Sequence, residues 1–172
     1  PKALDIVKAS IDYNVYVFKE KYPFFHKINR RTHNHIKLPK DFYSYRKELK
    51  LNHKDLYFYS PYYSCMKYQL GNLAFLNCNE NCPQPIVQNQ IVHFNKHKLI
   101  VVDSLDIDKR LKDNLYRNIA IQYYIKSRDS RENIEDFHEA FSKYSAHNIH
   151  FNEIEDVYQN ILNLQPKREV PS

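Results

Sequence analysis

Two cysteines and two histidines within twenty residues form the ligand set of a Cys2His2 metal site. Three residues separate Cys78 from Cys82, and ten residues later His93 and His97 repeat that spacing. Thiolate sulfur and imidazole nitrogen are the ligands of structural Zn²⁺ sites. The spacing is nonstandard, because two-residue gaps between cysteines and about twelve residues before the first histidine are more usual. The sequence favours a polar loop with two incidental thiols and a surface-turn histidine, without a cofactor, and leaves a nonstandard structural zinc site at these four residues as the alternative.

A second candidate site is the basic, aromatic segment 19–54. It holds eleven Lys or Arg against three acids, a net charge of +8, while the remainder of the chain sums to −2. Cations interleaved with flat rings are typical of surfaces that bind nucleic acid, where Lys and Arg neutralise phosphates and aromatic rings stack on bases. The predicted phosphate contacts are Lys27, Arg30, Arg31, Lys37, Arg46, Lys47 and Lys50, with Phe24, Phe25 and Tyr45 as stacking groups.

This segment favours a non-catalytic protein that contacts RNA or a ribonucleoprotein assembly, with other protein subunits as further partners. Two alternatives stay open. One is a protein-interaction subunit or pathogen-type effector that uses an exposed surface of Tyr57, Tyr59, Tyr62 and Tyr63. The other is an enzyme whose catalytic groups meet only in three dimensions.

One pair of residues resembles a known catalytic pattern. Arg131 and His138 match the loose Arg-x4-6-His pattern of the HEPN ribonucleases. The resemblance implies ribonuclease activity on an all-helical fold. Residues seven apart on a helix share a face, so a solvated stripe is the alternative interpretation.

Composition excludes several classes of protein. Gly71 is the only glycine in 172 residues, and one glycine cannot build a phosphate-cradling loop. An odd count of three cysteines does not make a disulfide framework and predicts an intracellular location. No apolar run approaches the ~20 residues that span a bilayer, so a membrane is not an expected partner.

The secondary structure expected around these residues indicates an α+β fold with a small, mostly antiparallel sheet. Two β-rich runs, 90–94 and 98–102, flank the polar residues 95–97 and predict a hairpin. Further strands are expected at 56–63 and 73–76, although a helix over 62–70 stays open. In the basic segment, Asp41 is expected to cap a short helix to about Leu51.

Helices are expected at both ends of the chain. Apolar residues from Leu4 to Phe18 recur at steps of three and four, which predicts a helix that packs on the core and stops before Pro23. Three more helices are predicted by the stripes 107–123, 134–144 and 157–161, the last two behind capping-box pairs. The expected organisation is a single domain over residues 1–164 with a loose tail at 165–172.

Overall fold

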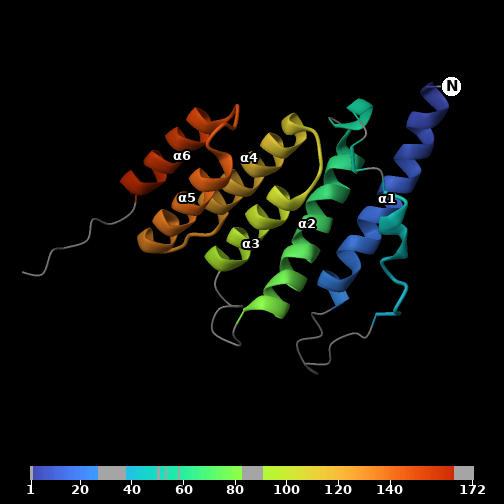
Figure 1. Ribbon diagram of the computed structural model, residues 1–172, viewed down its shortest axis with the longest axis horizontal. Helices are drawn as coiled ribbons and strands as arrows, with labels where there is room; N and C mark the ends of the chain where they lie inside the picture. Colours follow the sequence, from blue (N-terminus) through green and yellow to red (C-terminus); the bar gives the residue numbers. More distant parts are fainter. Residues whose placement is uncertain are drawn as a thin grey trace, which may run out of the picture. The chain divides into compact units, whose positions relative to one another are not determined.

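The computed structural model describes residues 2–26, 38–49, 51–52, 54–57, 59–82 and 91–164 (Figure 1). All regular elements in these ranges are helical: α1 (Lys2–His26), α2 (Ser60–Asn81), α3 (Ile91–Ser104), α4 (Lys109–Lys126), α5 (Arg131–Ser145) and α6 (Phe151–Leu164), with the short 3-10 helices η1 (Ser44–Lys47) and η2 (Lys54–Leu56). The predicted α+β fold is therefore wrong, since no strand occurs in the described ranges.

The predicted β-hairpin is the helix α3. Val92, Asn95, Leu99 and Val102 are buried, and their spacing of three, four and three residues is that of one helix face. α3 packs against α4 and α5, so this face is covered. Ile, Val and Phe favour strands by less than about 1 kcal/mol each, which tertiary burial readily overrides. Residues 95–97 also lack the glycine that a three-residue hairpin loop favours.

The other two predicted strands lie in or beside α2. Residues 73–76 are inside this helix, and Ser60 and Pro61, from the predicted strand 56–63, lie in its first turn. Proline is tolerated in the first turn of a helix, because its missing N–H would have no partner there. The alternative of a helix over 62–70 is confirmed.

The chain divides into two compact units, residues 1–72 and 73–172, with the division inside α2. The expected single domain is not decided by this division and stays a prediction, and the expected tail at 165–172 lies outside the described residues. Each unit is described separately below.

In the first unit, α1 lies beside the N-terminal part of α2 (Figure 1). Tyr13 of α1 packs edge to face on Tyr62 of α2, with ring centroids 5.0 Å apart. α1 runs through Pro23 to His26 instead of stopping before the proline. The helix expected from Asp41 to Leu51 is shorter than predicted, since only the 3-10 helix η1 forms there.

In the second unit, α3, α4, α5 and α6 pack around a core that includes Leu111, Leu115, Phe137, Phe141 and Ile154. The three helices predicted for this region are confirmed. The side chain of Asp108 caps α4 by accepting from the N–H of Arg110. The side chain of Ser130 caps α5 by accepting from the N–H of Asn133.

Candidate metal centre

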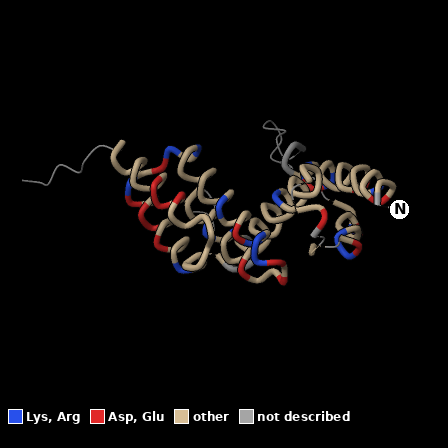
Figure 2. The backbone as a smooth tube through the Cα atoms, turned by 90° about the horizontal axis from the view of Figure 1, so that it is seen from above, with Lys and Arg blue, Asp and Glu red and all other residues tan. Residues whose placement is uncertain are grey.

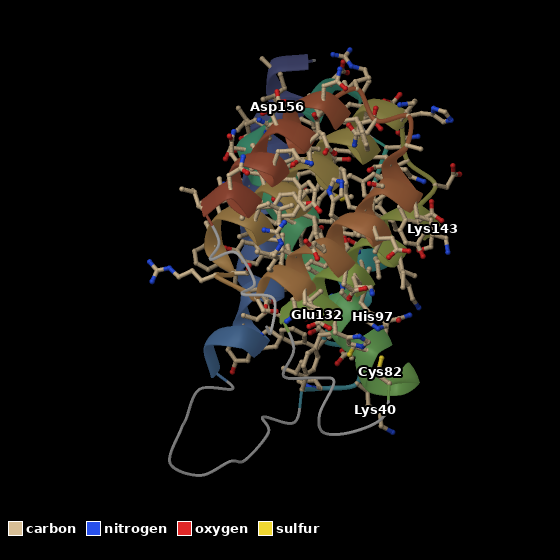
Figure 3. The ribbon with its side chains drawn as sticks, turned by 90° about the vertical axis from the view of Figure 1, so that its left-hand side faces the viewer. Lys40, Cys82, His97, Glu132, Lys143 and Asp156 are labelled. Atoms are coloured by element: carbon tan, nitrogen blue, oxygen red, sulfur yellow. The ribbon has the colours of Figure 1, made fainter. Side chains whose placement is uncertain are left out.

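The four predicted metal ligands come together at one place in the second unit. Figure 3 labels two of them, Cys82 and His97. Cys78 is near the C-terminal end of α2 and Cys82 directly follows the helix, while His93 and His97 lie on α3. Each pair is four residues apart, and side chains at that spacing share a helix face. The histidines were expected on either side of a hairpin turn, and the helix instead aligns both rings.

The ligand atoms are close to one another. The sulfur of Cys82 is 2.9 Å from Nε2 of His93 and 3.1 Å from Nε2 of His97. The two Nε2 atoms are 3.1 Å apart. All four ligand atoms, including that of Cys78, lie within 4.8 Å of one another. The cluster can hold a metal ion.

The donor set fits tetrahedral Zn²⁺. Zn–S bonds of about 2.3 Å and Zn–N bonds of about 2.0 Å place neighbouring ligand atoms roughly 3.3–3.8 Å apart around a tetrahedron. The contacts between Cys82 and the two imidazoles are a few tenths of an ångström shorter than these edges. The widest separation in the cluster, up to 4.8 Å, is longer than these edges, so the side chains must shift for the four atoms to form a regular tetrahedron.

Asn77 orients one of the two imidazoles. Its Oδ1 lies 2.7 Å from Nδ1 of His97. An amide oxygen only accepts hydrogen bonds, so Nδ1 donates and the neutral ring presents the lone pair of Nε2 to the cluster. Metal-binding histidines commonly have such a partner on the second nitrogen, which sets the tautomer and the ring orientation.

Burial sets the protonation of these residues. It lowers the pKa of His93 and His97, assisted by Lys96 for the first and by His93 for the second. Both rings thus favour the neutral form that binds metals. Burial and the hydrogen bond with Cys82 raise the pKa of Cys78 to about 11. A cation at the site would oppose this shift by stabilising the thiolate.

The third cysteine has no part in the cluster. Cys65 is 1% exposed in the first unit, and burial raises the pKa of its thiol to about 12. It is a small core residue, as a lone buried thiol usually is.

A polar network that the sequence did not predict occupies the first unit. Glu20 of α1 is fully buried, and one of its carboxylate oxygens accepts hydrogen bonds of 2.7 Å from Tyr45 Oη and Arg46 Nε. The other oxygen accepts from Arg46 Nη2 and from the side-chain amide of Asn72. The sequence offered one sign of this network. Glu20 is an acid in a strongly basic stretch, and its spacing from Tyr13 and Val17 puts it on the same helix face as these two residues.

This network involves two residues that were predicted to bind nucleic acid. Tyr45 is 4% exposed and Arg46 is paired with Glu20, so both side chains have a structural role inside the unit. Lys47 is exposed. The segment 27–37 and Lys50, which hold the other predicted phosphate contacts, lie outside the described residues, and nothing is described of the Phe24 and Phe25 side chains. Contact with RNA stays a prediction.

Several residues named for the alternative functions have structural partners or are buried. Tyr57 and Tyr62 are buried, which removes them from the expected exposed tyrosine surface. His138 is hydrogen-bonded to Tyr124 and Glu155, and Arg131 to Glu135, so each has structural partners on the helical fold. A depression between α3 and α5 contains neither histidine nor thiol; its lining is Lys96, Ile100, Asp136, Glu139, Ala140, Lys143 and Tyr144.

Fold and site together define an all-helical protein with a Cys2His2-like cluster that can hold a metal ion. No protein-family model, curated protein or solved structure matches the chain. Among the described helices, none combines the length and apolar character needed to cross a bilayer.

Proposed function

We propose that Cys78, Cys82, His93 and His97 bind one Zn²⁺ ion as a structural site. The observation that supports this function is the convergence of two cysteines and two histidines, each pair four residues apart, within 4.8 Å. The four-residue spacing places the two side chains of each pair on the same side, so that both pairs can contact one ion.

The ligands favour zinc over harder cations. Two thiolates and two imidazoles suit a borderline-soft ion with tetrahedral preference, whereas Mg²⁺ and Ca²⁺ take oxygen ligands. Four protein ligands also complete the tetrahedron and leave no position for water or substrate. The site is therefore structural rather than catalytic.

The role of the site is to join the end of α2 to α3. The segment 83–90 separates these two helices in sequence, and the ligand pairs on its two sides are brought together when the unit folds. Because the unfolded chain does not hold the four ligands in place, binding of the ion stabilises the folded arrangement.

Cobalt substitution tests the proposal. Apo protein prepared with a chelator and a reductant is titrated with Co²⁺ and followed by visible absorption. Intense bands of tetrahedral Co²⁺ with sulfur-to-metal charge transfer, saturating at one equivalent and lost on addition of Zn²⁺, are expected.

The variants Cys82→Ser and Cys65→Ala make a matched pair, since both remove one thiol and only the first removes a ligand. Cys82→Ser should weaken the charge-transfer band and lower affinity at least tenfold, while Cys65→Ala should retain both. Octahedral cobalt spectra, or equal behaviour of the two variants, would refute the site.

A further inference from the structure

The helix α1 has a stripe of exposed apolar residues, of which Tyr22 also packs against Phe42 of the same unit, with ring centroids 5.8 Å apart. Its members recur at steps of three and four residues: Leu4, Val7, Ile11, Val15, Phe18 and Tyr22. Leu4 and Phe18 are each 74% exposed and Ile11 is 62% exposed. The sequence predicted a helix that packs on the core, and α1 does so, but through Tyr13, Val17 and Glu20 instead of through the periodic apolar residues.

The stripe is large enough for a stable interface. Its exposed side chains present roughly 700 Å² of accessible surface, close to the ~800 Å² that each partner contributes to a standard interface. Contiguous apolar patches of this size commonly mark binding surfaces. Figure 2 shows that basic and acidic residues are interspersed along α1.

The charges beside the stripe indicate what covers it. One flank carries Asp5, Lys8, Asp12 and Lys19, whose signs alternate along the helix as −, +, −, +. Read from the other end, the series is +, −, +, −. In an antiparallel second copy centred near Ile11, each of these charges lies about 3 Å along the helix axis from an opposite charge, an offset that a long lysine side chain can span.

The register follows from the same residues. Pairing Asp5 with Lys19 and Lys8 with Asp12 of the second copy centres the helices near Ile11. Two-fold symmetry then makes each ion pair twice, and residues that contact one another do so reciprocally. In a parallel two-fold pair this flank would lie beside the opposite flank of the second copy, so these four residues would not meet one another. Lys19 also lies over the ring of Tyr45, with Nζ 4.8 Å from the centroid, and its three donors allow both contacts.

We propose that α1 pairs antiparallel with α1 of a second copy of this chain, about a two-fold axis near Ile11, to form a homodimer. The stripe of one copy covers the stripe of the other. The core face of α1 is unchanged, so each first unit keeps its own packing. The inference does not depend on the metal centre.

Sedimentation equilibrium and light scattering of the zinc-loaded full chain test the dimer. The mass of a dimer is expected at micromolar concentration, and Ile11→Asp with Phe18→Asp should raise the dissociation constant more than a hundredfold while circular dichroism stays helical. Leu164→Asp is the matched control, because Leu164 of α6 is 81% exposed and lies off the stripe. A wild-type monomer at 100 μM, or an unchanged dimer in the α1 variant, would overturn the proposal.

Cross-linking tests the direction of the helices. Ile11→Cys should cross-link to itself, whereas Leu4→Cys should not, because its two copies would lie ~21 Å apart along the axis. A mixture of Leu4→Cys with Phe18→Cys should yield a mixed dimer. The wild-type chain, treated in the same way, measures the cross-linking that arises from the native cysteines alone. Self-cross-linking of Leu4→Cys without the mixed product would contradict the antiparallel arrangement.

A charge exchange tests the flank. Lys8→Glu should weaken the dimer several-fold, because two-fold symmetry removes two ion pairs at once, and Lys8→Glu with Asp12→Lys should restore it. Equal dissociation constants for the single and double variants would contradict the predicted ion pairs.

Discussion

The two units each bury a polar cluster, and the clusters differ in the kind of partner they need. In the first unit, the carboxylate of Glu20 accepts hydrogen bonds from Tyr45, Arg46 and Asn72, so donors surround one acceptor group. In the second unit, two sulfurs and two imidazole nitrogens converge at a single point. The first cluster is satisfied by protein groups, whereas the second has the composition of a metal coordination shell.

This difference indicates how each unit holds its helices together. Glu20 joins α1 to η1 and α2 through charge-assisted hydrogen bonds, which are stronger than neutral ones and stay within the chain. The Cys2His2-like cluster joins α2 to α3 through groups that gain most when one cation binds all four. The stability of the second unit should therefore depend on a solution component, and that of the first should not.

Removal of zinc should have the largest effect on the free energy of unfolding. At a free zinc concentration about a thousand times its dissociation constant, a site present only in the folded state contributes about 4 kcal/mol to the free energy of unfolding. We expect a chelator to raise amide hydrogen exchange at the end of α2 and in α3, with α1 unchanged. Mass spectrometry of peptides from chelated and zinc-loaded protein measures this difference.

The control for chelation is Cys82→Ser, in which the chelator should have no further effect. Equal loss of protection in α1 and α3 would show that the two clusters do not differ as described.

Loss of the buried carboxylate of Glu20 should have the second-largest effect on the free energy of unfolding. This effect should fall on the first unit. Glu20→Gln leaves the largely buried guanidinium of Arg46 without its counter-charge, which should lower the free energy of unfolding by about 3 kcal/mol. Urea unfolding measures it, with the exposed Glu48→Gln as the control. Cobalt affinity should stay unchanged, because the metal ligands lie in the other unit.

A double replacement sharpens this prediction. Glu20→Leu with Arg46→Met removes both charges, so much of the stability lost in Glu20→Gln should return. A double variant less stable than Glu20→Gln would show that the remaining network, and not charge pairing, holds η1 to α1.

Loss of the amide beside His97 should have the smallest effect. Asn77→Ala removes the acceptor for Nδ1 of His97, which should lower zinc affinity by about 10- to 100-fold in a competition titration. Asn77→Asp keeps an acceptor at that place and should bind at least as tightly as wild type. Unchanged affinity in Asn77→Ala would show that packing alone orients His97.

The amino-acid sequence by itself determined the helices α4, α5 and α6 and the identity of the four candidate metal ligands. The apolar residues of these helices repeat with the helical period, and capping residues such as Asp108 precede the first residues of α4 and α5. Local pattern and tertiary packing therefore agree. The cysteines and histidines were recognisable from residue type, since few side chains bind soft cations.

Tertiary structure alone decided that α3 is a helix, that the two ligand pairs meet, and that Glu20 is buried with Arg46. Strand propensity in α3 is a small local term, while burial of Leu99 and Val102 against neighbouring helices is larger and depends on residues far away in sequence. The Glu20 network joins residues 25 to 52 positions apart, and no local pattern encodes such contacts.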